Sequence, residues 1–330
     1  MMQAFSTQVA NQKLRNVPSI SSISSIMRYT KKRMGLERNV LMQQSWVIAV
    51  DLDGTLLRSD QTISAANRQA LQMARELGHT VVIATGRPLR TALPFHQELG
   101  LTTPLITLNG GMIWSPQKDM VLSQTVLSTN SLYRLTKLAE IFDGYAVLAE
   151  AGTSCYQVTV DHLVGWPSEM KAFFEAAVLN GPFSAKAKLW PEEGSLPEAP
   201  NAVLLSVPRE NHETFFVQLA QLGLPDIQWR SWRSPHSIIE IIASGVSKAT
   251  AIQYVMNYLS MEQTSVMAFG DEMNDVAMLQ FADRGIAMGN ANSLLLPHAN
   301  DVTATNEEDG VAGYLQQFLQ LSLRSSSPST

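Results

Sequence analysis

The chain has 330 residues, of which 45% are hydrophobic, and it carries 24 Lys/Arg against 29 Asp/Glu. This length allows two domains, or one domain with a large insertion. The formal net charge of −5 argues against a nucleic-acid-binding protein, and the single cysteine, Cys155, excludes an internal disulfide framework and a cysteine zinc cluster. The single cysteine is typical of a protein in a reducing compartment, and we expect a cytoplasmic location. Because no apolar run reaches 18 residues, we expect no membrane-spanning helix.

Residues 1–44 differ in composition from the remainder of the chain. They contain seven Lys/Arg, one acid (Glu37) and the Ser-rich stretch PSISSISSIMRYTKKRMG. This composition is typical of an organellar transit peptide, which is one interpretation. The other is a disordered tail, or sequence upstream of a true start at Met42, and we favour this second interpretation.

From residue 46 onward, short apolar runs alternate with amphipathic stretches. The pattern predicts strands at 46–50, 80–85 and 104–110, a helix at 64–78 with Ser64 as its N-cap, and a helix at 88–100 opened by Pro88. The same alternation returns near the C-terminus, with helices predicted at 247–260, 271–282 and 310–323 and strands at 265–270 and 285–289. Strands that alternate with helices indicate a parallel sheet covered on both faces.

The middle of the chain has a different pattern. Polar and apolar residues alternate at 145–152 and 154–160, and a helical stretch follows at 212–223. We therefore expect an α/β fold in which a Rossmann-like three-layer core with a parallel sheet carries an inserted α+β cap domain. The expected boundaries are an extension at 1–44, core at 45–112, cap at 113–235, core at 236–322 and a tail at 323–330.

Four polar motifs fall where predicted strands end or predicted helices begin. They are Asp51-Leu52-Asp53-Gly54-Thr55, Thr85-Gly86-Arg87, Lys248, and Gly270-Asp271-Glu272-Met273-Asn274-Asp275. Ligands of open α/β sheets bind at the carboxyl ends of the strands, so we expect these motifs to converge. Asp271 and Asp275 are four residues apart and would share one face of the helix predicted at 271–282.

The carboxylates in these motifs suggest a metal site. Carboxylates that lie close together repel, and each is costly to remove from water, so a cation is expected to offset that cost. Asp51, Asp53 and Asp271 offer hard oxygen ligands without histidine or cysteine, which suits Mg²⁺. We include Asp275 in the expected metal site, and Mg²⁺ is the expected cofactor.

The motifs together resemble the haloacid dehalogenase (HAD) superfamily, and most closely its Cof-type branch (subfamily IIB), which has a large α/β cap. The resemblance extends from about Trp46 to Leu321 and includes NGG (109–111), GVSKATAI (245–252), MAFGDEMNDVAML (267–279), GIAMGNA (285–291) and NEEDGVAGYL (306–315). Ser-Lys-Ala stands here where the branch often has Ser-Lys-Gly.

The resemblance implies a role for each motif residue. Asp51 would attack phosphorus and form an aspartyl-phosphate, while Asp53 would act as general acid and base and offer its backbone carbonyl to the metal. Lys248 would stabilise the phosphoryl oxygens, and Asp275 would orient Lys248 or a metal-bound water. The residues expected to bind phosphate or substrate are Thr85, Gly86, Arg87, Asn109, Gly110 and Asn274.

The expected function is that of a Mg²⁺-dependent phosphatase acting on small phosphorylated metabolites, either sugar phosphates or phosphorylated cofactors such as flavin mononucleotide or pyridoxal phosphate. A phosphomutase of the same superfamily and a non-catalytic metabolite-binding regulator stay open as alternatives. We expect no nucleic-acid or membrane partner, and a monomer or weak homodimer. We interpret Cys155, the tryptophans of the cap and His236 as structural residues.

Overall fold

The computed structural model describes residues 45–157, 188–189, 198–231 and 238–326. The chain divides into two compact units, residues 45–316 and residues 1–44 with 317–330. In the latter unit, the described residues form the end of helix α10 (Gly310–Ser326). The three sheets described below all lie in the unit of residues 45–316.

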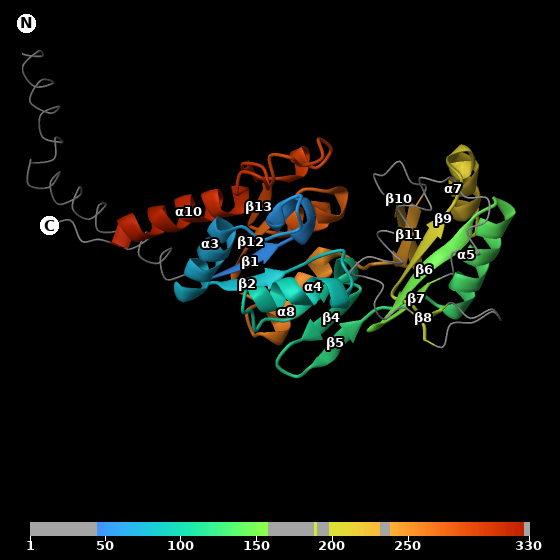
Figure 1. Ribbon diagram of the computed structural model, residues 1–330, viewed down its shortest axis with the longest axis horizontal. Coiled ribbons are helices and arrows are strands. Elements are labelled where there is room, and N and C mark those ends of the chain that lie inside the picture. Colours follow the sequence, from blue (N-terminus) through green and yellow to red (C-terminus); the bar gives the residue numbers. More distant parts are fainter. Residues whose placement is uncertain (1–44, 158–187, 190–197, 232–237, 327–330) are drawn as a thin grey trace, which may run out of the picture. The chain divides into compact units, whose positions relative to one another are not determined.

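A five-stranded sheet forms the core, and all of its pairings are parallel (Figure 1). Its strands, in spatial order, are β14 (Asp301–Val302), β13 (Arg284–Ala287), β12 (Ser265–Gly270), β1 (Trp46–Val50) and β2 (Thr80–Ile83). Strand β1 lies inside the sheet, between β12 and β2, and is buried from Val47 to Val50, because a strand covered on both faces requires apolar residues on both. This arrangement confirms the expected Rossmann-like α/β core.

Helices pack on this sheet because their apolar faces match it. On one face, Val255 of α8 (Lys248–Tyr258) and Leu279 of α9 (Val276–Phe281) join a hydrophobic cluster with Ala49 of β1. On β12, the Phe269 ring contacts Tyr314 of α10 edge-on, with ring centroids 5.6 Å apart. Helix α3 (Ala65–Glu76) contacts β2. No helix in the described part of the chain is both long and apolar enough to cross a membrane.

Most expected helices and strands occur within a few residues of the predicted bounds. Ser64 caps α3 as expected, accepting a hydrogen bond from the backbone N–H of Asn67 at 3.0 Å. Pro88 is the N-cap of α4 (Leu89–Glu98), and Ser247 caps α8. These caps fix where each helix begins, and therefore where the polar residues around them lie.

The strand expected at 104–110 is shorter than predicted. Strand β3 (Leu105–Thr107) ends where Leu108 and Asn109 adopt positive φ angles of 51° and 58°. It joins the core sheet through a parallel bridge between Ala84 and Ile106, and it also pairs antiparallel with β4 (Met112–Ser115), which pairs with β5 (Met120–Gln124). The left-handed backbone turns the chain at Asn109, out of the line of the strand.

A second, mainly antiparallel sheet has six strands (Figure 1). Their order is β10 (Ile227–Ser231), β11 (Ile238–Ala243), β9 (Ala202–Ser206), β6 (Tyr145–Ala151), β7 (Ser154–Gln157) and β8 (Lys188–Leu189). Helices α5 (Thr129–Ile141) and α7 (His212–Gln221) share a hydrophobic cluster with it. This sheet and its helices confirm an α+β cap; the boundaries expected at 112/113 and 235/236 stay predictions.

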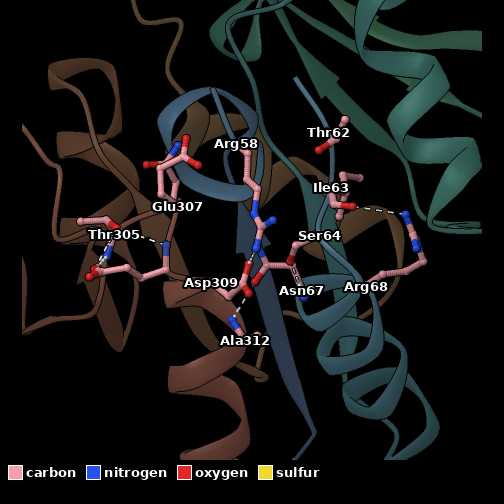
Figure 2. A network of polar contacts seen from close by, with 12 residues as sticks. Arg58, Thr62, Ile63, Ser64, Asn67, Arg68, Thr305, Glu307, Asp309 and Ala312 are labelled. Carbon is pink, nitrogen blue, oxygen red and sulfur yellow. Dashed lines mark hydrogen bonds and ion pairs between the residues drawn. The ribbon is translucent and has the colours of Figure 1, made fainter. Parts of the chain in front are cut away.

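Polar contacts hold the turn after β1 to a distant part of the chain. Residues 52–56 form this turn, and Gly54 adopts a φ of 70° within it. The Asn290 side chain donates to the carbonyl of Gly54, and the Asn306 side chain donates to that of Leu57, both at 2.8 Å. Figure 2 shows the Arg58 guanidinium pairing with Asp309, also at 2.8 Å. The turn that carries Asp53 is therefore tied to the loops around β14.

Asn67 extends this network into the core. Its side chain is fully buried and donates to the Leu56 carbonyl at 3.3 Å. It also accepts from the backbone N–H of Ala312 at 2.9 Å, and Figure 2 shows these two residues together. We expect Asn67→Ala to lower the free energy of unfolding by about 1–3 kcal/mol, because two buried backbone groups lose their partner. Urea titration measures this. The control is Gln72→Ala, which removes an exposed amide bonded to Glu76 on the same helix; equal effects of the two changes would contradict the prediction.

A buried histidine makes stability depend on pH. His96 is 1% exposed, and its Nε2 lies 2.8 Å from the carbonyl oxygen of Thr103. Burial lowers the pKa of His96 below its ordinary value of 6.5. The folded state therefore favours the neutral ring. The contribution of neutral His96 to the free energy of unfolding is complete above pH 6.5 and is lost as the pH falls below that value. Urea titrations at several pH values should show this fall, and His96→Gln should make it shallower; an unchanged slope in the variant would contradict the assignment.

Candidate active site

Lys248 lies between two carboxylates at the carboxyl ends of β1 and β12. Its Nζ atom is 2.7 Å from Oδ1 of Asp51 and 2.6 Å from Oδ1 of Asp275. Lys248 and Asp275 have no exposed surface, and Asp51 is 5% exposed. Burial acts to lower the pKa of Lys248, but Asp275 and Asp51 outweigh burial and raise it, so the ammonium stays charged.

Two of the carboxylates are held in an electrostatically costly state. Burial raises the pKa of Asp51 well above its ordinary value; Lys248 opposes this shift, and Asp275 and Asp271 add to it. Burial and the nearby Asp275 charge raise the pKa of Asp271 to about 7. Such shifts indicate that Asp51 and Asp271 lack enough nearby positive charge in the protein alone.

Asp271 is fixed against the turn after β1. Thr55 donates its hydroxyl to Oδ1 of Asp271 at 3.1 Å. A β-carbon at Gly54 would lie 2.2 Å from Oδ2 of Asp271, so only glycine permits this approach. The Asp51 motif and the Asp271 motif, far apart in sequence, therefore meet at one edge of the sheet.

The geometry around Asp275 differs from the expected helix. A 3₁₀ turn (Met273–Asp275) precedes α9, so Asp271 lies before the helix and not on its face. Oδ2 of Asp275 accepts the backbone N–H groups of Asp271 and Glu272 at 3.0 and 3.1 Å. The expectation of a shared helical face was wrong: the Asp275 carboxylate binds these N–H groups and holds the chain in a turn.

Three of the four expected metal-site residues form one acidic cluster. Carboxylate oxygens of Asp51, Asp271 and Asp275 all lie within 4.8 Å of one another. Their all-oxygen chemistry fits a hard divalent cation, and the raised pKa values of Asp51 and Asp271 show that added positive charge would stabilise the ionised forms. The side chain of Asp53, the fourth residue, points elsewhere.

Asp53 is paired with Arg87. Its carboxylate accepts hydrogen bonds from Nε of Arg87 at 2.7 Å and from an Arg87 terminal nitrogen at 2.5 Å. The Asp53 side chain is 52% exposed, whereas that of Arg87 is 11% exposed, lies over the Phe95 ring and also donates to Gln61. Arg87 thus fixes the direction of Asp53, and a direct contact of Arg87 with substrate stays a prediction.

The residues expected to bind phosphate gather beside this cluster. Asn109 donates its backbone N–H to the Thr85 carbonyl at 2.9 Å and accepts from the Asn274 side chain at 2.8 Å. Gly86 lies against the Asn109 side chain, and a β-carbon at Gly110 would lie 2.3 Å from the carbonyl oxygen of Ser247. These contacts bring the expected phosphate-binding residues into one neighbourhood. The backbone N–H of Arg87 also donates to the Thr85 hydroxyl at 3.1 Å, while the Arg87 guanidinium is engaged with Asp53.

Comparison with known proteins identifies the family. The family model described as haloacid dehalogenase-like hydrolase matches residues 48–315. The chain belongs to the haloacid dehalogenase-like hydrolases. This confirms the family that the motifs indicated.

Individual relatives of this hydrolase agree with the assignment. The chain is 34% identical to a 5-amino-6-(5-phospho-D-ribitylamino)uracil phosphatase of Bacillus subtilis, over 84% of this chain and 98% of the relative. It is 28% identical to a pyridoxal phosphate phosphatase of Escherichia coli, over 83% and 98%. A solved haloacid dehalogenase-like hydrolase from Bacteroides thetaiotaomicron superposes with a TM-score of 0.67 at 25% identity, over 83% and 100%. These relatives confirm the expected enzyme class, phosphoric monoester hydrolase.

The motif analysis of this hydrolase missed two ion pairs. Arg90 of α4 binds Glu150 of β6 through two hydrogen bonds of 2.5 and 2.6 Å. Arg230 of β10 pairs with Glu240 of β11 at 2.7 Å. The sequence contained a signal of both pairs, because each glutamate interrupts an otherwise apolar strand. Glu150 lies in VLAEA and Glu240 lies in IIEIIA. A charge inside such a strand requires a partner.

Of the other residues considered in the cap, the structure describes some and leaves others outside the described ranges. Cys155 is 2% exposed, and burial raises the pKa of its thiol to about 12, so it is a neutral buried group as expected. Trp114 is buried and Trp229 is 37% exposed. The remaining residues, Trp166, Trp190, Trp232 and His236, lie outside the described residues.

Proposed function

We propose that this hydrolase is a Mg²⁺-dependent phosphatase that removes phosphate from a small metabolite through an aspartyl-phosphate on Asp51. The observation that supports this most directly is the position of Lys248, whose ammonium is buried between Asp51 and Asp275. A charged lysine held against a carboxylate at the end of a buried strand can orient that carboxylate and attract phosphoryl oxygens.

In the proposed reaction, an Asp51 oxygen bonds to phosphorus while the bond between phosphorus and the leaving oxygen breaks. Asp53 donates a proton to the leaving oxygen. In the second step it takes a proton from the water that attacks the phosphorus of the aspartyl-phosphate, the bond between phosphorus and the Asp51 oxygen breaks, and inorganic phosphate leaves while the Asp51 carboxylate is restored. Arg87 holds the Asp53 carboxylate in a fixed direction between these steps. Lys248 and the Thr85 hydroxyl stabilise the transferring phosphoryl oxygens.

The proposed metal site comprises the Asp51 and Asp271 carboxylates and the backbone carbonyl of Asp53. Asp275 positions the proposed ligands, because it binds the backbone N–H of Asp271 and the ammonium of Lys248. When bound, Mg²⁺ supplies charge that offsets the repulsion between the phosphate dianion and the carboxylates. Asn274 offers a further polar atom here, since its Oδ1 is buried and without a hydrogen-bond donor among the described residues.

Mg²⁺ is expected to raise the thermal unfolding midpoint, because an ion that binds only the folded state stabilises it. The midpoint should rise with Mg²⁺ concentration, and excess EDTA should reverse the rise. Asp271→Asn should remove most of the rise, since one carboxylate of the cluster is lost. A rise of equal size in Asp271→Asn would place the ion elsewhere.

The proposed substrates follow from the relatives. The Bacillus subtilis relative is named for 5-amino-6-(5-phospho-D-ribitylamino)uracil and the Escherichia coli relative for pyridoxal phosphate. We propose that this chain acts on a phosphate monoester of the same kind, with the ribitylamino-uracil ester first among the candidates because the identity to that relative is greater. The cytoplasmic location and the oligomeric state stay predictions.

The deciding experiment is phosphate release from a panel of esters by the purified chain, with Mg²⁺ and with EDTA. The panel contains both named esters, flavin mononucleotide and several hexose monophosphates. Mg²⁺-dependent release of phosphate supports the proposal. Conversion of a hexose monophosphate to its isomer without net release would identify a phosphomutase. Binding without turnover of any ester would identify a regulator.

A further inference from the structure

The loop that follows strand β13 contacts two motifs of the candidate active site. Its Asn290 donates a side-chain N–H to the backbone carbonyl of Gly54 at 2.8 Å. Two residues later, the backbone N–H of Asn292 donates to the carbonyl of Asp271, also at 2.8 Å. The loop therefore joins the turn after β1 to the motif after β12, although none of its residues has a role in the proposed reaction.

Asn290 is itself held by a second loop. Its Oδ1 accepts the backbone N–H of Asn306 at 2.9 Å, and the Asn306 side chain donates to the Leu57 carbonyl at 2.8 Å. Because a carbonyl oxygen only accepts and a backbone N–H only donates, one orientation of the Asn290 amide satisfies both of its partners. The two asparagines thus hold the turn at two points, Gly54 and Leu57.

The Gly54 peptide needs a contact from outside the turn. Gly54 has a φ of 70°, and glycine can adopt a wide range of backbone angles, so the residue does not fix its own conformation. A β-carbon at this position would lie 2.2 Å from Oδ2 of Asp271, so the turn lies directly against that carboxylate. A shift of the Gly54 peptide therefore changes the position of the turn within the site.

Asp53 depends on this peptide, because Gly54 follows it directly. Arg87 binds the Asp53 carboxylate and sets its direction, but the printed bonds between them involve only the side chains. The Asp53 side chain is 52% exposed, so little packing holds it. The position of its backbone is set by the peptides on either side, and Asn290 binds the one that follows Gly54.

Attachment of the turn to the protein does not depend on Asn290 alone. Asn306 binds the Leu57 carbonyl, and the Arg58 guanidinium pairs with Asp309 at 2.8 Å (Figure 2). Asn290 is exposed, so water can replace its hydrogen bonds at little cost in stability. Removing its side chain would therefore leave the turn attached but free the Gly54 peptide to move.

We propose that Asn290 is a positioning residue of the active site, which holds the turn at Gly54 so that Asp53 stays in place for proton transfer. Asn290 touches none of the reacting atoms and acts through the Gly54 peptide. This inference rests on the proposed function, since Asp53 is the acid and base of the proposed reaction.

The first test is Asn290→Ala in the purified chain, with saturating Mg²⁺ and the panel ester that the native chain hydrolyses fastest. We expect kcat to fall about tenfold, because a misplaced acid and base slows both steps of the reaction. KM and the thermal midpoint should stay close to the native values, since Asn290 is exposed and lies outside the proposed substrate contacts. An unchanged kcat would overturn the inference.

A second ester distinguishes the positioning of Asp53 from a general loosening of the site. In 4-nitrophenyl phosphate the leaving group departs readily without a proton, so the first step depends less on Asp53 as an acid. In Asn290→Ala, the fall in kcat/KM should therefore be several times smaller for 4-nitrophenyl phosphate than for the panel ester. Equal falls on the two esters would overturn the inference.

Asn290→Asp tests the donor alone. This variant can still accept the N–H of Asn306, but its carboxylate cannot donate to the Gly54 carbonyl. It should change the ratio of the two kcat/KM values in the same direction as Asn290→Ala. Both esters carry the same phosphate group, so the added negative charge largely cancels from this ratio. A native ratio in Asn290→Asp would overturn the inference.

The matched control is Asn300→Ala, at the other end of β13. Asn300 is also exposed, and its Oδ1 accepts the backbone N–H of Gly285 at 2.6 Å. Its loss should leave kcat and the ratio at the native values, and an equal effect of the two alanine variants would contradict a specific role of Asn290. A native chain that releases phosphate from no ester would instead overturn the proposed function, so the two failures are distinguishable.

Discussion

Asp51→Asn is expected to reduce the release of phosphate by at least about a thousandfold on every substrate of the chain, because an amide cannot form the proposed aspartyl-phosphate. The loss should appear in kcat, since the attack on phosphorus is removed while the other residues of the site are unchanged. Steady-state kinetics with Mg²⁺ present measures it.

The fold of Asp51→Asn should be retained. Asparagine has nearly the same shape as aspartate, and burial already raises the pKa of Asp51, so a neutral side chain is tolerated at this position. Circular dichroism and the thermal midpoint check this point. Turnover close to that of the native chain would exclude Asp51 as the nucleophile and leave the acidic cluster with a metal-binding role only.

Lys248→Met is expected to lower both activity and stability. Its ammonium pairs with Asp51 and Asp275, and all three side chains are buried. Removing one partner of a buried ion pair costs about 3–5 kcal/mol, because an uncompensated charge is left behind. Urea titration should show this loss. Lys248 acts to lower the pKa of Asp51, so this pKa should rise further in the variant, and the variant should lose stability relative to the native chain as the pH rises above 3.8, the ordinary pKa of the Asp51 carboxyl.

The control for this second prediction is Lys137→Met, at an exposed lysine that pairs with Glu140 on helix α5. Exposed pairs of this kind contribute little, so the urea midpoint should stay that of the native chain. If Lys248→Met were as stable as this control, the carboxylates around Lys248 would have to be satisfied in some other way, and the electrostatic account of the site would fail.

The sequence predicted the core and the site where local signals coincide with tertiary structure. Strand β1 was predicted to the residue, because five consecutive apolar side chains are typical of a strand buried on both faces. The convergence of Asp51, Lys248 and Asp271 followed from the rule that ligands bind at the carboxyl ends of parallel strands. Both expectations depend only on periodicity and on chain order.

Other features depend on contacts that no local pattern shows. The hairpin of β4 and β5 was missed because its strands are short and their sequence lacks strict alternation. The turn before α9 was mistaken for helix because the side chain of Asp275 competes with the helical backbone for the N–H groups of Asp271 and Glu272. The pairing of Glu240 with Arg230 and Asn109 required the register of the cap sheet.

The order of strands in the core sheet has a consequence for biosynthesis. Strand β1 lies between β2, which follows it closely in the chain, and β12, whose Ser265 pairs with Trp46. Contacts between residues so distant in sequence form slowly, because a long loop must close first. A ribosome-bound chain that stops before β12 would hold Asp51 beside an unpaired strand edge, without Asp271 or Asp275. Catalytic competence should therefore arise in one late step, when the C-terminal third of the protein has emerged.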